Sequence, residues 1–334
     1  MGYLLAHEEY NVNNNPFKPA WWLPNPHLQT MWPVLLRRNI KNIELERERV
    51  ELPDGDFIDM DWVGRSGIGP LVLILHGFEG SIESHYAKGM LQKIVQNGWR
   101  GVFMHFRGCS GEPNRLPRNY HSGETSDVAY IVNLLRERDN NPKIAVIGYS
   151  LGGNVLLKWL GETGNQNPLK AAIAISVPFE LHKASQRIQH GFSRCYQWYF
   201  LKCLRERLTI KYQYVPNAPL KPSQLGSVRT IMEFDNQFTA PLHGFANVDE
   251  YYTKASSRQY LRGIQVPTLI LHAKDDPFMS EDVIPEKHEL SPHVNFELTE
   301  AGGHVGFVTG KYPWRPEYWL EHRVPEFLKE QFIK

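Results

Sequence analysis

Cysteine, an excess of one charge and long apolar runs are all scarce in this sequence, and each scarcity excludes a class of protein. The three cysteines, Cys109, Cys195 and Cys203, show no CxxC spacing, so we expect small buried side chains and no disulfide framework. The 37 Lys and Arg nearly balance the 36 Asp and Glu, which argues against a nucleic-acid-binding protein. The longest purely apolar runs, such as 71–75, have five residues, whereas a membrane helix needs ~20.

The sequence also lacks targeting and cofactor motifs. Its first residues have neither the basic segment nor the long apolar segment of a secretory signal peptide. Together with the few cysteines, this favours a cytoplasmic protein. HExxH, Walker A and GxGxxG patterns do not occur, so the sequence does not support a metal, nucleotide or dinucleotide cofactor, and we expect none.

Apolar strands that alternate with helical segments predict an α/β protein with a mostly parallel central sheet flanked by helices. The predicted strands are 44–52, 57–63, 71–76, 101–106, 143–149, 171–177, 267–273 and 294–300. The predicted helices are 83–97, 124–138, 151–162 and 316–332.

Composition divides the chain into three parts. Residues 1–43 are rich in Pro, Asn and Trp, and their prolines forbid a continuous helix, so we expect an irregular arm packed on the core. This arm is either a packing anchor or a wall of the substrate site. The stretch 179–262 is helical and aromatic in character, which predicts a helical cap inserted into an α/β core made of 44–178 and 263–334.

The strongest motif is the GxSxG pattern Gly148-Tyr149-Ser150-Leu151-Gly152, where an apolar strand ends and a helix begins. A nucleophilic serine at such a turn has a strained backbone, and glycines two residues before and after it avoid collisions. We predict Ser150 as the nucleophile, with Gly148 and Gly152 as supporting residues. The alternative is a glycine-rich packing turn without chemistry.

A serine nucleophile needs a histidine base and an acid that orients the base, and in this type of fold they follow in the order Ser, acid, His. Asp275 and Asp276 follow the strand 267–273, and His304 follows the strand 294–300. We favour Asp276 as the acid because it directly precedes a proline-led turn, and Asp275 stays as the alternative.

Two other histidines are alternative bases, and one loop is expected to supply the oxyanion hole. His272 lies near the acid loop, and His76 precedes the loop that follows the strand 71–76. We expect the backbone N–H groups of Leu151 and Phe78 to bind the oxyanion, with Gly77 allowing the backbone to approach closely.

Arg107 follows the strand 101–106 and is therefore expected on the same rim as Ser150. It has two interpretations. One is a binding site for a carboxylate ligand, and the other is a structural salt bridge that holds its loop.

Six segments carry a family resemblance: PFKPAWWLPNPHLQT, LHGFEGS, FRGCSGEPNRLPRNYHSGETSD, GYSLGGN, AKDDPF and GGHVGF. With them the chain resembles, over nearly its whole length, the YheT-like branch of the α/β-hydrolases, the AB hydrolase 4 family. The resemblance implies an α/β-hydrolase fold with a cap and a Ser150–Asp276–His304 charge relay. It also implies hydrolysis of carboxylic esters with short- or medium-chain acyl groups.

The sequence thus predicts a serine hydrolase that cleaves a small-molecule ester with an apolar acyl group through an acyl-enzyme. An acyltransferase or thioesterase would use the same residues with another acceptor, and a peroxidase-type reaction also uses this triad. A non-catalytic ligand-binding module on a hydrolase scaffold is the alternative from another class.

Overall fold

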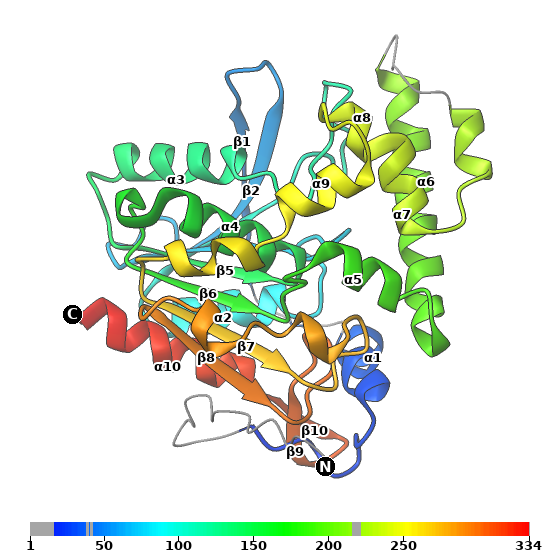
Figure 1. The fold of residues 1–334 in the computed structure, drawn as a ribbon. Coiled ribbons are helices and arrows are strands. Elements are labelled where there is room, and N and C mark those ends of the chain that lie inside the picture. The colour runs from blue at the N-terminus through cyan, green and yellow to red at the C-terminus, as the bar shows by residue number, and fades with distance from the viewer. Residues whose placement is uncertain (1–16, 38–39, 41–42, 216–221, 334) are drawn as a thin grey trace.

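The fold is described from a computed structural model, which describes residues 17–37, 40, 43–215 and 222–333. An eight-stranded sheet forms its centre, in the order β1-β2-β4-β3-β5-β6-β7-β8 (Figure 1). The strands are β1 (Glu46–Glu51), β2 (Phe57–Val63), β3 (Leu71–Leu75), β4 (Arg100–Met104), β5 (Ile144–Tyr149), β6 (Ala171–Ile175), β7 (Thr268–Ala273) and β8 (Val294–Thr299). β2 pairs antiparallel with β1 and with β4, and the other pairs are parallel.

Helices cover both faces of this sheet. They are α2 (Ala87–Gln96), α3 (Ser126–Arg138), α4 (Leu151–Thr163) and α10 (Leu320–Ile333). Side chains alternate along a strand, so Leu73 of β3 packs in one apolar cluster with α3 and α4, while Ile74 packs in another with α2 and α10. β3 to β7 are buried along their whole length, and for β3 the continuous apolar run predicted this. The predicted α/β-hydrolase architecture is confirmed.

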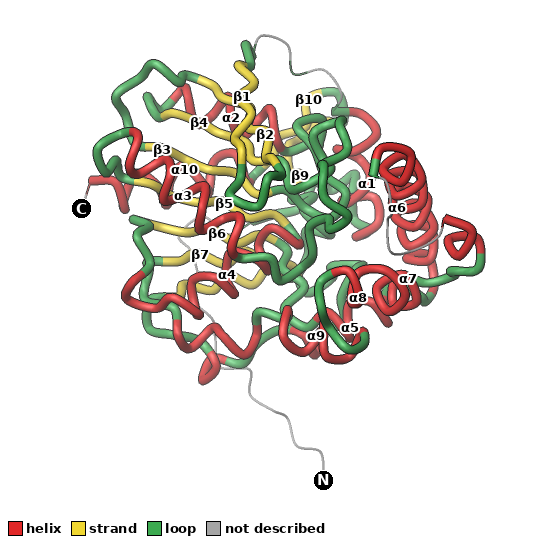
Figure 2. The backbone as a smooth tube through the Cα atoms, turned by 90° about the horizontal axis from the view of Figure 1, so that it is seen from above, coloured by secondary structure: helices red, strands yellow, loops and turns green. Residues whose placement is uncertain are grey.

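Helices fill the chain between β6 and β7. They are α5 (Leu181–Arg187), α6 (Arg194–Tyr214), α7 (Ile231–Phe234), α8 (Ala240–Leu242) and α9 (Val248–Ala255), with a π-helical turn at Asp235–Thr239. We call residues 179–262 the cap. The arrows of the parallel strands point toward the side of the molecule where the cap helices gather (Figure 1). The view from above also shows α5 to α9 together on one side of the sheet (Figure 2). The described helices include none that is long and apolar enough to cross a membrane.

The expectation of an irregular arm is wrong for part of residues 1–43, because α1 (Pro26–Leu36) is a helix. Pro26 lies in the first turn, where a missing N–H costs nothing, and the Asn25 side chain caps the helix by accepting from the His27 amide at 2.8 Å. Pro33 lies inside the helix and removes only the bond from its own position. Residues 1–16 lie outside the described chain.

The sequence reading also missed a hairpin near the C-terminus. β9 (Val308–Tyr312) and β10 (Arg315–Tyr318) form a separate antiparallel pair directly after the His304 loop. The last helix therefore begins at Leu320 and not at residue 316. Pro316 lies in β10 of this two-stranded sheet, a position where a proline is tolerated because no central ladder is interrupted.

Candidate active site

Ser150 lies in the sharp turn between β5 and α4. Its φ of 51° and ψ of −116° put a non-glycine residue in a strained region of the backbone map. A Cβ on Gly148 would lie 2.5 Å from the carbonyl oxygen of Gly152, and a Cβ on Gly152 would lie 2.5 Å from that of His76. Only glycine fits at both positions, which accounts for the motif spacing.

The structure brings Ser150, His304 and Asp276 together in one hydrogen-bonded chain. His304 Nε2 lies 2.9 Å from Ser150 Oγ, and His304 Nδ1 lies 2.7 Å from Asp276 Oδ2. Asp276 and His304 are both buried. This geometry matches a serine made nucleophilic by an imidazole whose tautomer is set by a carboxylate.

The two neighbouring aspartates face different partners. Asp276 Oδ1 accepts the Phe278 amide at 2.9 Å, which orients the carboxylate toward His304. Asp275 Oδ1 instead accepts the amide of Gly303 at 2.9 Å, and burial raises the pKa of this carboxyl group. Asp275 therefore braces the turn that carries the histidine.

Neither alternative base forms a hydrogen bond with Ser150 within the described chain, where the serine hydroxyl pairs with His304. His76 accepts the Phe106 amide on Nε2 at 3.0 Å, its Nδ1 lies 2.7 Å from the Gly77 carbonyl oxygen, and burial lowers its pKa to about 3. His272 is buried against the rings of Phe179 and Phe296, and burial lowers its pKa to about 4.

The His304 loop has supports that the sequence reading missed. The backbone N–H of His304 donates to Thr30 Oγ1 of α1 at 2.9 Å, and the next amide, that of Val305, donates to Ser176 Oγ at 3.0 Å. The Phe278 ring stacks on the imidazole with centroids 4.0 Å apart. The proline-rich arm gave no local signal of the contact with Thr30, because 274 residues separate the two partners.

The loop after β3 lies against Ser150. A Cβ on Gly77 would lie 3.2 Å from the Ser150 Cβ, so glycine permits the approach. The Gly77 amide already has a partner within the chain, because it donates a hydrogen bond to Tyr86 Oη at 2.8 Å. Within the described chain, the amides of Phe78 and Leu151 donate no hydrogen bond to another residue. Both predicted oxyanion donors are therefore available to a ligand.

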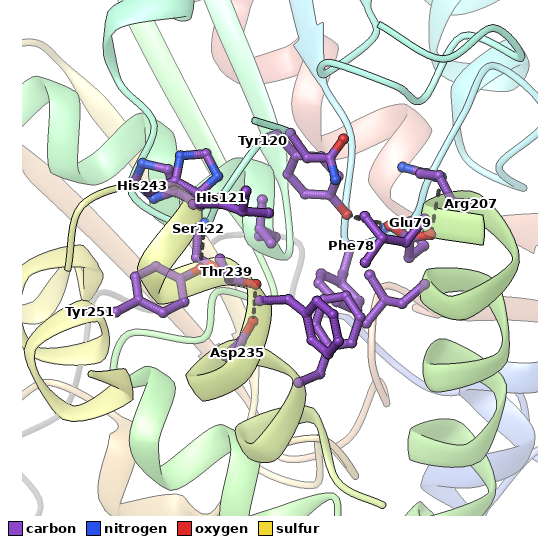
Figure 3. Close-up of a pocket in the computed structure, with 17 residues that line it drawn as sticks. Phe78, Glu79, Tyr120, His121, Ser122, Arg207, Asp235, Thr239, His243 and Tyr251 are labelled. Carbon is purple, nitrogen blue, oxygen red and sulfur yellow. Dashed lines mark hydrogen bonds and ion pairs between the residues drawn. The ribbon is translucent and has the colours of Figure 1, made fainter. Parts of the chain in front are cut away.

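A cavity of about 40 Å³ lies between these two residues and the cap (Figure 3). Apolar side chains of the cap form much of its wall: Leu204, Leu208, Phe234 and Phe238. Polar groups at its border include His121, Asp235 and His243. Asp235 is buried, with hydroxyl donors from Thr239 at 2.6 Å and Tyr252 at 2.7 Å, and burial raises its pKa to about 6.

Arg107 is buried among acidic side chains. Its guanidinium forms two 2.7 Å hydrogen bonds with Asp127 and further bonds with Asp54 at 2.7 Å and Asp56 at 3.1 Å. Its donors are thus directed at residues of the chain, which supports the structural interpretation over a carboxylate-binding site.

One described trio, His121, Glu124 and His243, has ligand atoms within 4.8 Å of one another, as a metal site requires. The contacts that these three side chains already make argue against a bound cation. Glu124 already pairs with Arg118 at 2.6 Å, and His121 Nδ1 accepts the Gly123 amide at 3.1 Å, which leaves the proton of the neutral ring on Nε2.

Comparison with known proteins places the chain in a family. Residues 70–311 match the alpha/beta hydrolase fold family. The chain is 46% identical over 316 residues to "Putative esterase YheT" of Escherichia coli (strain K12), which covers 93% of this chain and 92% of that protein. It is 29% identical to Phospholipase ABHD3 of Mus musculus, over 92% of this chain and 77% of that protein.

A further relative and a solved structure also match. A monoacylglycerol lipase of Saccharomyces cerevisiae is 30% identical over 78% of this chain and 59% of its own length. Among solved structures, an esterase of Pyrococcus furiosus has a TM-score of 0.57 at 18% identity, over 96% of this chain and 99% of that one, which shows a shared fold. The chain therefore belongs to the α/β-hydrolase fold family and, within it, to the YheT-like branch.

Proposed function

We propose that this protein is a serine esterase that hydrolyses carboxylic esters through an acyl-enzyme intermediate. The observation that carries the proposal is the continuous chain of hydrogen bonds from Asp276 through His304 to Ser150. Packing alone does not require side chains from three loops that are far apart in the sequence to form one hydrogen-bonded chain. The names of the relatives, an esterase, a phospholipase and a lipase, support ester hydrolysis.

In the first half of the reaction, Ser150 Oγ attacks the ester carbonyl carbon while His304 Nε2 takes the hydroxyl proton. The carbonyl oxygen becomes an oxyanion, which the amides of Phe78 and Leu151 bind. The C–O bond then breaks, His304 gives its proton to the departing alcohol, and the acyl group stays on Ser150. Loss of one of the two N–H groups that bind the oxyanion typically costs about 2.7–4 kcal/mol of transition-state stabilisation.

In the second half, a water molecule attacks the acyl-enzyme. His304 takes the water proton, a second oxyanion forms and collapses, and the proton returns to Ser150 Oγ as the carboxylic acid leaves. Asp276 stays ionised throughout, holding the proton of the neutral imidazole on Nδ1 and stabilising the imidazolium.

The substrate that fits this site is a small-molecule ester with an apolar acyl group. The cavity beside Phe78 and Leu151 supports this, because half of the cap residues that line it are Leu or Phe, whose side chains would cover an acyl chain and exclude water. The unpaired thiols of the three cysteines support the reducing cytoplasm as the working compartment.

The test is Ser150→Ala, measured with p-nitrophenyl esters of increasing acyl length. We expect kcat to fall on the order of 10⁶-fold, as removal of a serine nucleophile does elsewhere. The circular dichroism spectrum and melting temperature should match those of the unaltered protein, and a fluorophosphonate probe should label the unaltered protein alone. Undiminished turnover by Ser150→Ala would refute the proposal.

A further inference from the structure

We propose that Arg207, on the cap helix α6, is a positioning residue that holds the oxyanion loop, residues 77–80, in its working conformation through Glu79. The inference rests on the proposed function, because it concerns the amide of Phe78 as an oxyanion donor. Arg207 is not assigned a contact with the substrate. It acts on the residue that follows Phe78 in the chain.

The oxyanion loop is strained at Glu79. This residue has a φ of 54°, in the left-handed region that a non-glycine residue seldom adopts. Such a conformation is unfavourable and persists only where surrounding contacts enforce it. Because the peptide units of Phe78 and Glu79 are adjacent, relaxation at Glu79 would turn the Phe78 amide away from its target.

The contacts that enforce this conformation converge on Glu79, on both its backbone and its side chain (Figure 3). Its backbone N–H donates to Tyr120 Oη at 3.0 Å, and the same hydroxyl donates to Glu79 Oε1 at 2.8 Å. The second oxygen, Oε2, lies 3.1 Å from Arg207 Nη2. The Glu79 side chain is only 2% exposed, so burial raises the pKa of this carboxyl group while the Arg207 charge lowers it.

Arg207 lies on the side of α6 that is turned toward the core. Phe200, Leu204, Arg207 and Lys211 follow at spacings of four, three and four residues, which places them on the same side of a helix. Phe200 packs edge-to-face on the Phe78 ring, with centroids 5.2 Å apart. The cap therefore contacts both residues at the tip of the oxyanion loop.

Lys211 anchors this face one turn further along the helix. Its ammonium donates to Asn114 Oδ1 at 2.8 Å, to Asn119 Oδ1 at 2.7 Å and to the Arg118 carbonyl oxygen at 2.6 Å. Arg207 also contacts the Cys109 sulfur. Helix α6 is thus attached to the core by the buried Lys211 and by Arg207, whose side chain is 22% exposed, and Arg207 pairs with the residue next to an oxyanion donor.

The experiment compares Arg207→Met, Arg207→Lys, Glu79→Gln and the double variant Arg207→Met/Glu79→Gln. Lys202→Met on the exposed side of α6, where the lysine side chain is 53% exposed, is the matched control. Active sites are titrated with a fluorophosphonate, and kcat, KM and the labelling rate are measured with a short-chain ester well below each melting temperature.

We expect Arg207→Met to lower kcat about 10- to 100-fold, somewhat less than outright loss of an oxyanion donor. KM should change less than threefold, and the labelling rate should fall with kcat, because phosphonylation also develops charge on an oxygen in the hole. Arg207→Lys should recover part of the loss. The double variant should be more active than Arg207→Met, since it no longer buries an unpaired carboxylate. Lys202→Met should behave like the unaltered protein.

Two outcomes would overturn the positioning role. One is a lower melting temperature for Arg207→Met with unchanged kcat per titrated site, because that describes structural support alone. The other, which applies if Arg207→Met fails to fold, is unchanged kcat in both Arg207→Lys and Glu79→Gln. Failure of the unaltered protein to label at Ser150 would instead refute the proposed function, so the two failures are distinguishable.

Discussion

The rim of the sheet and the cap are held in place by different kinds of contact. At the rim, Ser150, Asp276 and His304 lie on short loops directly after β5, β7 and β8, and backbone amides fix two of these loops. The cap is held by side chains whose partners are remote in the chain, such as Arg207 on Glu79 and Lys211 on Asn119. Strand ends and loop amides thus arrange much of the rim, with Thr30 and Ser176 as remote supports of the His304 loop, while tertiary side-chain contacts arrange the cap.

This difference predicts how each region responds to substitution. A change at the rim should affect the chemistry with little effect on stability, because the strands below it are fully buried and independent of any one loop residue. A change in the cap should first affect stability or the seating of the cap. Three experiments test the comparison, in addition to those at Ser150 and Arg207.

The largest effect is expected at the rim, from Asp276→Asn compared with Asp275→Asn. An amide at 276 would present an N–H or a neutral oxygen to His304 Nδ1 and favour the wrong imidazole tautomer, so kcat should fall about 10⁴-fold. An amide at 275 keeps an oxygen for the Gly303 amide, so its kcat should stay within about tenfold, as expected for a single neutral hydrogen bond. Steady-state kinetics on the same ester check this pair, and equal losses would contradict the assignment of the acid.

A smaller effect is expected in the cap, where Asp235→Asn should raise stability at high pH. Burial raises the pKa of Asp235 from 3.8 to about 6, so the folded protein binds a proton between these values that the unfolded chain does not. Stability therefore falls as pH rises through this window, and above it the buried charge costs up to about 3 kcal/mol.

Urea unfolding at two pH values measures this difference. At pH 8 the Asp235→Asn variant should be more stable than the unaltered protein, and at pH 4 the gap should nearly close. The amide still accepts the Thr239 hydroxyl, which limits other changes. A gap of the same size at both pH values would show that the carboxyl group titrates normally and that its burial is not costly.

The smallest effect is expected from Thr30→Val in α1. This substitution tests whether α1 contributes to the activity of the site at the rim. The variant removes the acceptor of the His304 amide, and one hydrogen bond contributes about 0.5–1.5 kcal/mol, so kcat should fall roughly 2- to 10-fold. Thr30→Ser keeps the hydroxyl and should retain full activity. If valine at this position leaves kcat unchanged, the arm acts as packing and not as part of the site.

Much of the rim was accessible from the sequence because it follows local rules. A continuous apolar run predicts a buried parallel strand, and the carboxyl ends of such strands meet at one edge. That reasoning predicted loops for Ser150, Asp276 and His304 at the edge where the structure has them within hydrogen-bonding range. Steric need for glycine at 148 and 152 gave the nucleophile turn an additional signal.

The remaining features depend on contacts that leave no local pattern. Helix α1 was missed because its prolines were read as breakers, whereas Pro26 begins the helix. The Glu79–Arg207 pair joins residues 128 positions apart, and Arg107 finds its partner Asp127 only once the loops are folded. Charged residues such as Glu79 and Arg107 look like surface residues in a sequence, and only the tertiary structure shows that their side chains are buried.

Helix α1 also changes what counts as a transferable unit. The family match begins at residue 70, yet Thr30 accepts the His304 amide, and Gln29 donates to the Val308 carbonyl oxygen at 3.0 Å and accepts the Val308 amide at 2.7 Å. A chimera that exchanged only residues 70–311 between two relatives would separate the histidine loop from the helix that supports it. Exchanges in this branch should therefore carry α1 along with the core.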